Sequence, residues 1–427
     1  MRLILPQDLG EHADIGTVET VKPRRGDQVN IDGENIGMNR RKNMQASEIS
    51  VGAPLSPGQL ATLRVLQFAV AALAVAVSSA AAAGIQTWHP PQRIIPVPHP
   101  ITSLLRSPRV HRELRLSPET AERIESAVES IDLPLWRLRN LLSDKRNGRA
   151  VELIKELKRR LSEILSIRQM DRLNQIVWQA RGVEAILDPE VAARLKLSAA
   201  QANRISSLLN AGYERIAQVR MNTQVRPESV KHAQIRNIRV ETQRKVAAVL
   251  SGAQRNDLAL LLGRPIDLSQ VRVVACKAPE IEAEIWINSS EVRLSNLRGK
   301  VAVVHFYAFG CGNCVRSLPY YNDWVKRFDA NSFAIIGIHR PETERERDVE
   351  KVREKAAKAG MKYPIGADND SLAWNAWANH TWPTTYLVDK NGYIRYWWYG
   401  ELNWQGNDSE RYLRERIREL IGESAES

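Results

Sequence analysis

The chain has 427 residues, of which 43% are hydrophobic, and a formal net charge of +12 at pH 7. This length predicts two or three domains, since a domain commonly holds roughly 150 residues. Three cysteines are too few for a disulfide framework that holds a small secreted scaffold together. The positive charge is compatible with nucleic acid, an acidic membrane surface or a solvated basic face. Zinc-finger spacing and an aromatic RNA-binding motif are both missing, and alternating acids and bases in stretches such as "KELKRRLSEIL" favour a solvated helix face, so nucleic acid is a minor hypothesis.

The N-terminal region, residues 1–64, is rich in glycine, asparagine and charge and lacks apolar periodicity. We expect it to be disordered, because such a segment cannot bury enough apolar surface to fold. Met38 and Met44 are plausible alternative start residues, since "MNRRKNM" supplies a basic flank to the segment that follows.

An apolar run, "VLQFAVAALAVAVSSAAAA" followed by Gly84, predicts a signal peptide or membrane anchor at residues 65–84. It reaches the length of about 20 residues that a spanning helix needs, and its small residues offer several A-x-A cleavage sites. Basic residues precede it, so the positive-inside rule keeps that side cytoplasmic and exports the remainder. We expect a periplasmic or cell-envelope protein; cleavage of the segment is left open, and a buried alanine-rich helix is the alternative.

Residues 85–108 contain "HPPQRIIPVPHP" and a further proline. Prolines at this density favour an extended, semi-rigid spacer. We expect this linker to separate the export segment from the first folded unit.

Residues 109–268 have a helical pattern in which a short motif repeats. Four segments share Leu-Ser: "LSPETAERI", "LSIRQMDRL", "LSAAQANRI" and "LSGAQRNDL". In each, the serine can act as a helix N-cap, and in three a glutamine three residues later can complete a capping box. The serines are Ser117, Ser166, Ser198 and Ser251, the glutamines are Gln169, Gln201 and Gln254, and the apolar residues that follow at helical spacing are Ile124, Leu173, Ile205 and Leu258. The pattern predicts a helical bundle or hairpin array.

These motifs resemble the "LTxxQ" repeats of the Spy and CpxP family of extracytoplasmic helical stress proteins, whose members form curved helical hairpins. The resemblance implies a chaperone-like role for this module, and a packing or docking module is the alternative. No catalytic constellation is visible in this region.

Residues 277–423 alternate β-rich and helical stretches. The expected elements, in order, are strands at 283–288 and 301–307, a helix at 314–328, a strand at 332–338, a helix at 346–359, a hairpin of strands at 384–389 and 393–399, and a helix at 409–421. "DKNG", residues 389–392, supplies the hairpin turn. This is a thioredoxin-like order. The predicted fold class is thus multi-domain, with an α-helical module followed by an α/β thioredoxin-like domain.

Several spaced blocks resemble one family. They are "WINSSEVRLSNLRGKVAVVHFYAFGCGNC", "GIHRPE", "YPIGADND" and "WPTTYLVDKNGYIRYWWYGE". Together they resemble the thioredoxin-like domains of the TlpA, ResA and DipZ type, which are exported and often membrane-tethered thiol oxidoreductases. The resemblance implies action on thiols and disulfides of extracytoplasmic proteins, electrons from a membrane thiol transporter, apocytochromes c as substrates, and no cofactor.

"CGNC" contains the two cysteines Cys311 and Cys314. We expect Cys311 at a helix N-terminus, where unpaired N–H groups and the helix dipole favour the thiolate that attacks disulfides. Cys314, one turn further, can attack the mixed disulfide at Cys311 and release the substrate. A metal site would need two more ligands that no second C-x-x-C or standard histidine spacing supplies. A purely structural disulfide is disfavoured in this fold, and the peroxiredoxin pattern P-x-x-x-[TS]-x-x-C is missing.

The third cysteine, Cys276, lies just ahead of this domain without a neighbouring cysteine. We expect an inert or partly buried thiol, and an intermolecular bridge is the alternative in an oxidising compartment.

The resemblance also implies a substrate-binding segment. "Trp382-Pro383-Thr384" matches the family's cis-proline, which would place the backbone of Trp382 beside Cys311 to pair with a peptide. Gly312 and Asn313 agree with the C-x-N-C subset, and because this dipeptide tunes the thiol pKa and potential, the direction of electron flow stays open. We expect two or three tryptophans near the cysteines to bind unfolded polypeptide and the others to fill the core, out of the six at Trp374, Trp377, Trp382, Trp397, Trp398 and Trp404.

Two residues are candidate proton acceptors for Cys314. His305 stands where common thioredoxins carry a buried aspartate, and its reference pKa near 6.5 suits the task; a core histidine held by a hydrogen bond is the alternative. Glu342 resembles the active-site glutamate of ResA-like proteins, and a solvated carboxylate is the alternative. The sequence therefore predicts an exported thiol-disulfide oxidoreductase, with a non-enzymatic helical chaperone or scaffold as the rival.

Overall fold

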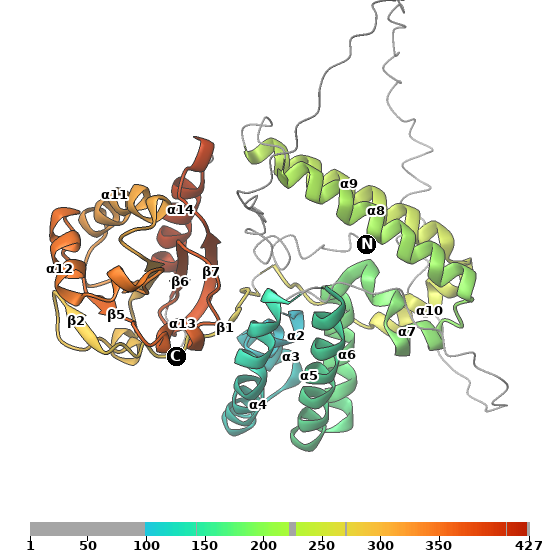
Figure 1. Cartoon of the computed structure of the whole chain (residues 1–427). Helices are drawn as coiled ribbons and strands as arrows, with labels where there is room; N and C mark the ends of the chain where they lie inside the picture. Colours follow the sequence, from blue (N-terminus) through green and yellow to red (C-terminus); the bar gives the residue numbers. More distant parts are fainter. Residues whose placement is uncertain (1–98, 142, 222–227, 270, 407, 425–427) are drawn as a thin grey trace, which may run out of the picture. The chain divides into compact units, whose positions relative to one another are not determined.

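The computed structural model describes residues 99–424 except 142, 222–227, 270 and 407 (Figure 1). The expected disordered region 1–64, the export segment 65–84 and residues 85–98 of the expected linker lie outside the described residues. Within the described part of the chain, no helix combines the length and the apolar composition that crossing a membrane requires.

The first half of the described chain is helical, as predicted. Its helices are α2 (Pro100–Leu105), α3 (Pro108–Leu114), α4 (Pro118–Arg137), α5 (Ser143–Ile164), α6 (Ile167–Arg181), α7 (Pro189–Arg194), α8 (Ala199–Met221), α9 (Glu228–Val249) and α10 (Gly252–Leu262), with the 3-10 turns η1 (Leu138–Asn140) and η2 (Gly182–Leu187). All four Leu-Ser motifs begin helices. Ser117 accepts an N–H bond at the start of α4, and complete capping boxes open α6 and α10 at Ser166 and Ser251. Ser198 and Gln201 exchange the same pair of bonds at the start of α8.

The end of the expected linker is folded rather than extended. Residues 100–105 form α2, in which Ile101, Leu104 and Leu105 are at most 1% exposed. Pro100 is the first residue of this helix, where its missing N–H costs nothing, and Pro108 has the same position in α3. The proline density predicts a spacer, but two of these prolines mark helix starts.

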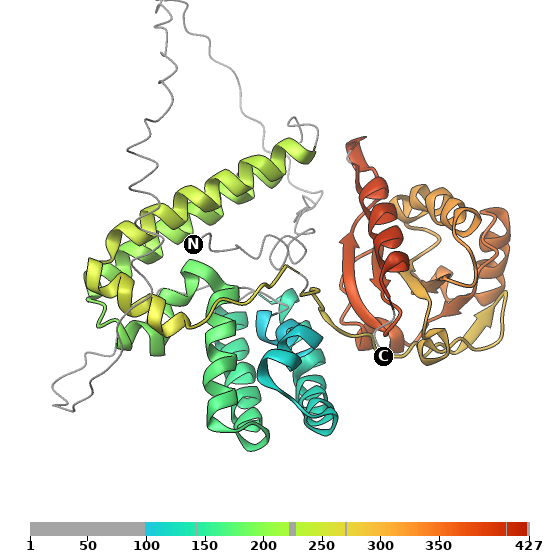
Figure 2. The same cartoon turned by 180° about the vertical axis from the view of Figure 1, so that it is seen from behind.

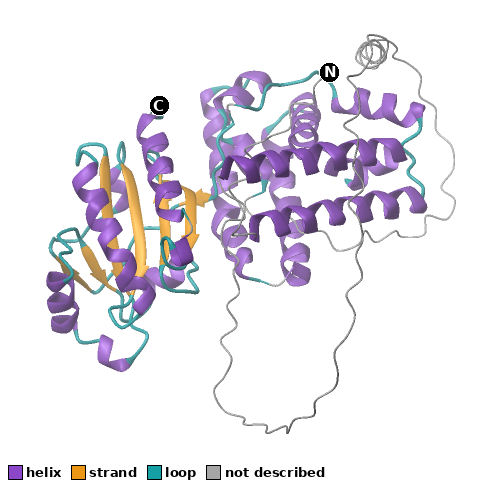
Figure 3. Ribbon diagram, turned by 90° about the horizontal axis from the view of Figure 1, so that it is seen from above, coloured by secondary structure: helices purple, strands orange, loops and turns teal. Residues whose placement is uncertain are grey.

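The helical region has two apolar cores. One lies among α2 to α6 and includes Ile124, Leu157, Leu161 and Leu173. The other includes Trp178 from α6 and residues of η2, α7, α8 and α9. The long helices α8 and α9 run side by side as a hairpin, as Figures 1 and 3 both show, and Arg215 pairs with Glu241 across it. A helical bundle with a hairpin is therefore confirmed.

The C-terminal half is built on one seven-stranded mixed sheet in the order β1-β7-β6-β3-β4-β5-β2. The strands are β1 (Cys276–Lys277), β2 (Ile285–Ile287), β3 (Val301–Tyr307), β4 (Phe333–His339), β5 (Ile365–Ala367), β6 (Thr384–Val388) and β7 (Tyr393–Tyr399). Strands β3, β4 and β5 are parallel, whereas β6 and β7 run antiparallel to their neighbours. All seven residues of β3 are buried, as expected for a central strand covered on both faces.

Helices cover both faces of the sheet. They are α11 (Gly312–Arg327), α12 (Val349–Lys358), α13 (Leu372–Ala376) and α14 (Ser409–Gly422), with the 3-10 turns η3 (Leu294–Leu297), η4 (Glu344–Glu346) and η5 (Trp404–Gly406). Residues of α11, α12 and α14 share a core with Val301 and Val303 of β3, whereas α13 packs with Val304 and Phe306 on the other face. Figure 2 shows α14 running alongside β7. The hairpin turn is at residues 389–392, as predicted, with a positive φ at Gly392.

Candidate functional site

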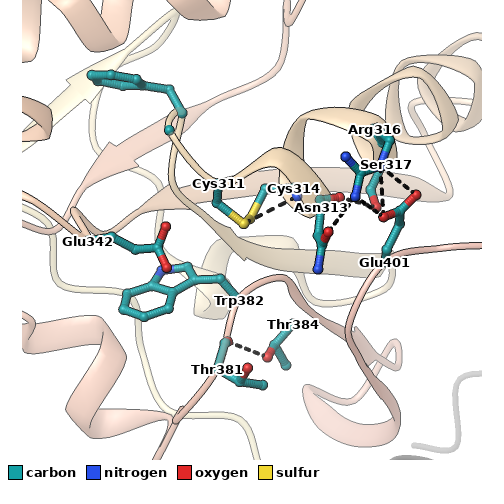
Figure 4. Close-up of a disulfide and its surroundings, with 12 residues drawn as sticks. Cys311, Asn313, Cys314, Arg316, Ser317, Glu342, Thr381, Trp382, Thr384 and Glu401 are labelled. Carbon is teal, nitrogen blue, oxygen red and sulfur yellow. Dashed lines mark hydrogen bonds and ion pairs between the residues drawn. A yellow bond between two sulfur atoms is a disulfide. The ribbon is translucent and has the colours of Figure 1, made fainter. Parts of the chain in front are cut away.

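The cysteine pair lies where the chain leaves β3 and enters α11. Cys311 is the N-cap residue of α11 and forms a disulfide with Cys314, with 5.2 Å between their Cα atoms (Figure 4). The N–H of Cys314 donates a hydrogen bond of 3.3 Å to the sulfur of Cys311. An N–H donor and the helix dipole both favour the thiolate at this position. Cys311 is 9% exposed and Cys314 is 1% exposed, so Cys311 is the more accessible cysteine.

The segment before β6 contains the cis peptide bond Trp382-Pro383, as the resemblance predicted. The ring of Trp382 packs against the cluster that contains both cysteines. Its Nε1 donates to the carbonyl of Arg340 at 3.2 Å, and its ring lies 4.3 Å from that of Trp374. These contacts fix the side chain of Trp382, which is partly buried.

Gly312 and Asn313 form the exposed first turn of α11. The side-chain oxygen of Asn313 accepts a hydrogen bond from Arg316, which also forms an ion pair of 2.6 Å with Glu401 (Figure 4). Ser317 in turn accepts the N–H of Leu402 at 3.1 Å. The loop after β7 is thereby fastened to the helix that presents the cysteines.

His305 is buried in β3 on the same face of the sheet as α11. Its ring stacks on that of Tyr321 with 4.1 Å between centroids, and its Nε2 lies 3.1 Å from the hydroxyl of Tyr363. Burial lowers the pKa of His305 to about 3, because charging the ring away from water is costly. The ring is therefore a weak base at neutral pH, and its contacts favour the core interpretation over the proton acceptor.

The buried carboxylate of this site is Glu346, not Glu342. Glu342 is exposed, whereas Glu346 is 2% exposed. Glu346 accepts the N–H groups of Gly310 at 2.6 Å, Glu342 at 2.7 Å and Thr343 at 2.9 Å. A Cβ at Gly310 would overlap the Glu346 carboxylate, so a larger residue in the turn before Cys311 would displace that carboxylate. Glu346 is not among the predicted site residues, although Thr343 to Glu346 has the T-x-x-E spacing of a capping box.

His339, at the end of β4, supports the same turn. Its Nε2 accepts the N–H of Phe309 at 3.3 Å, and the two rings stack with 5.2 Å between centroids. Burial lowers the pKa of His339 to about 4, although the nearby Glu346 carboxylate acts in the opposite direction. The neutral ring is the form that can accept this bond. Two buried side chains thus hold the consecutive N–H groups of Phe309 and Gly310, directly before Cys311.

The chain is similar to known proteins over its C-terminal part. The family model described as AhpC/TSA family matches residues 274–397. DipZ of Mycobacterium tuberculosis is 34% identical over 137 residues, which are 31% of this chain but 19% of DipZ. ResA of Geobacillus kaustophilus, a thiol-disulfide oxidoreductase, is 31% identical over 127 residues, which are 30% of this chain and 69% of that protein. Through this domain, the chain belongs to the ResA-type thiol-disulfide oxidoreductases. A solved thiol-disulfide isomerase from Corynebacterium glutamicum aligns with 24% identity and a TM-score of 0.31, covering 34% of this chain and 98% of that one.

The aromatic surface of the ResA-type domain is smaller than its tryptophan content suggests. Trp374, Trp377 and Trp397 are buried in the sheet core, so they have a packing role. Trp404 is 48% exposed, and Arg316 lies 5.8 Å from the centre of its ring. The partly buried Trp382 packs against the cluster with both cysteines.

The third cysteine takes no part in the ResA-type site. Cys276 is fully buried in β1, and burial raises the pKa of its thiol. A buried thiol with a raised pKa is inert, as the sequence predicted. Within residues 99–424, leaving aside the gaps, His, Cys, Asp and Glu side chains form no group of three that could hold a metal ion.

Proposed function

We propose that this chain is a thiol-disulfide oxidoreductase that acts on protein substrates through the Cys311/Cys314 couple. The observation that carries the proposal is the position of the pair. Cys311 caps α11, accepts an N–H bond and is the more accessible cysteine, and Cys314 is within disulfide-bonding distance behind it. Kinship with the ResA-type proteins supports the same chemistry.

In the reducing direction, the reaction is two thiol-disulfide exchanges. The thiolate of Cys311 attacks one sulfur of a substrate disulfide, forms a mixed disulfide and releases the first substrate thiolate, which takes up a proton. The thiolate of Cys314 then attacks the sulfur of Cys311, forms the internal disulfide and releases the second substrate thiolate. Two electrons pass from the dithiol to the substrate disulfide, and an external thiol donor must reduce the internal disulfide again.

The neighbouring residues have proposed roles in binding and proton transfer. We assign Trp382, Pro383, Gly312 and Asn313 to the surface that receives an extended polypeptide next to Cys311. The contacts of Trp382 with Arg340 and Trp374 support this role, because they hold the ring against the cysteine cluster. Between the two candidate proton acceptors, Glu342 is the better one, since solvent reaches it whereas His305 is fully buried.

We further propose that the protein works as a reductant outside the cytoplasm, held to the membrane or exported through residues 65–84. Its electrons would come from a membrane thiol transporter, and apocytochromes c are the candidate substrates. The resemblance to the TlpA, ResA and DipZ type and the apolar run in the sequence support this proposal.

Reduction of insulin by dithiothreitol tests the proposed activity. The wild-type protein is expected to accelerate precipitation of the insulin B chain, whereas Cys311→Ser is expected to leave only the dithiothreitol background, because the attacking sulfur is gone. Cys276→Ser is the matched control and keeps the wild-type rate if it folds. A rate that does not depend on Cys311 would favour the rival function, a chaperone or scaffold with a docking domain.

A further inference from the structure

The backbone carbonyls of Trp377 and Ala378 lie directly after α13, at the start of the segment that leads to Pro383. The carbonyl of Trp377 accepts hydrogen bonds from Trp136 Nε1 at 3.2 Å and from Arg139 at 3.1 Å. The carbonyl of Ala378 accepts from Arg139 at 2.8 Å and from Asn140 at 2.7 Å. All three donors belong to the end of α4 and to η1 in the helical region. Two carbonyls of the thioredoxin-like domain therefore accept hydrogen bonds from side chains far earlier in the chain. Arg139 and Trp377, for example, are 238 residues apart.

Ala378 makes this dependence stronger. Its φ is +49°, a left-handed conformation that residues other than glycine seldom adopt. Such a conformation persists where the surrounding contacts hold it. The hydrogen bonds from Arg139 and Asn140 are contacts of this kind, because they fix the direction of the Ala378 carbonyl.

Arg139 is also connected to the substrate-binding segment by a chain of hydrogen bonds. It donates to the hydroxyl of Tyr386 at 3.1 Å, and that hydroxyl donates to the side-chain oxygen of Asn379 at 2.8 Å. The amide nitrogen of Asn379 donates to the carbonyl of Thr381 at 3.1 Å, and the hydroxyl of Thr384 donates to the same carbonyl at 2.8 Å. The chain ends at the residue directly before Trp382.

The end of α4 is itself firmly anchored. Trp136 is fully buried among residues of the sheet core, with 4.8 Å between its ring and that of Trp397. The guanidinium of Arg139 lies 3.8 Å from the centre of the Trp136 ring and also donates to the hydroxyl of Tyr399 at 2.7 Å. One turn earlier, Asp132 accepts the N–H of Lys277 in β1 at 3.0 Å. The Trp136 ring and the Tyr399 hydroxyl thus hold the Arg139 side chain in the position from which it donates to the carbonyls of Trp377 and Ala378.

We infer that Arg139 is a positioning residue that holds the segment 379–383 in its substrate-binding shape, so that the helical region takes part in binding extended polypeptides. This inference rests on the proposed function. Arginine suits the role because its planar guanidinium carries five donors at fixed angles, whereas lysine offers one charged centre. The helical region is then a structural part of the binding site.

The test uses the full chain and two readouts. Insulin reduction gives KM and kcat, and the rate at which dithiothreitol reduces the Cys311-Cys314 disulfide reports the cysteines without a polypeptide. Arg139→Ala is expected to raise KM about tenfold, because bonds from a charged donor are lost, and to change reduction by dithiothreitol less than twofold. Arg139→Lys should recover part of the loss. Arg137→Ala, an exposed arginine two residues earlier, should match the wild type.

A second variant keeps the inference testable if Arg139→Ala does not fold. Asn140 is exposed, so Asn140→Asp leaves the core intact and turns a carboxylate toward the Ala378 carbonyl, which should raise KM severalfold. An unchanged KM in both variants, with an active wild type, overturns the inference. A parallel fall of both readouts together with the melting temperature also overturns it, because it indicates a structural role alone. Wild type without cysteine-dependent insulin reduction overturns the proposed function instead.

Discussion

Cys314→Ser is expected to accumulate a covalent complex with a disulfide-containing substrate. In this variant the sulfur of Cys311 still forms the mixed disulfide, but no second thiolate is present to break it. Insulin turnover should fall by roughly two orders of magnitude or more, since release then depends on an external thiol. On a non-reducing gel, the complex should appear as a band that dithiothreitol removes.

Cys311→Ser is the matched control for this trapping experiment. Cys314 is 1% exposed and lies behind Cys311, so it should not reach a protein disulfide when it is the only thiol of the pair. Equal trapping by both variants, or trapping by Cys311→Ser alone, would contradict the roles assigned to the two cysteines.

Glu346→Ala is expected to destabilise the domain and to slow substrate reduction at the same time. The Glu346 carboxylate accepts three N–H groups, including that of Gly310 directly before Cys311. Because a buried donor left unsatisfied costs about 1–3 kcal/mol, the free energy of unfolding should fall by about 2–4 kcal/mol in total. Urea unfolding measures this change, and insulin reduction should slow several-fold because the turn that carries Cys311 loosens.

Glu344→Ala is the control in the same loop. Glu344 is exposed and pairs with Arg347 at the surface, so its loss should change the unfolding free energy by less than about 0.5 kcal/mol. If Glu346→Ala and Glu344→Ala unfold at the same urea concentration, the buried carboxylate does not hold the turn.

The parts of the fold that were predicted correctly have local signals. The central strand β3 is a run of apolar residues between turn signals. Helix α11 starts at the cysteine pair, which follows a strand and precedes a helix as in thioredoxin-like proteins. Each Leu-Ser motif carries its own cap within four residues, so its helix start needs no distant partner. The hairpin turn at residues 389–392 is likewise set by its own sequence.

The missed elements depend on distant partners or are too short for a periodic pattern. Strands β1 and β5 have two and three residues and exist because β7 and β4 pair with them. Residues 100–105 share the proline density that favours a linker, although Pro100 stands at a helix start. Their burial depends on packing against α4 and α6, which the local sequence does not reveal.

The site was predictable as far as its motif extends. Cys311, Cys314 and the cis bond at Pro383 lie in blocks that resemble a family. Glu346 could not be chosen over Glu342, because the choice depends on the N–H of Gly310, 36 residues earlier in the chain. Arg139 had no signal, since its partners in the thioredoxin-like domain lie 238 to 260 residues away.

The reduction potential of the Cys311/Cys314 couple tests the central claim most directly. The full-length protein is equilibrated with glutathione buffers, and alkylation followed by mass measurement counts the thiols at each ratio. A single two-electron transition with a potential near that of thioredoxin, about −270 mV, is the expected result for a reductase. A potential near about −120 mV would contradict the reducing direction, and failure of Cys311 and Cys314 to form an internal disulfide at any ratio would contradict the redox function itself.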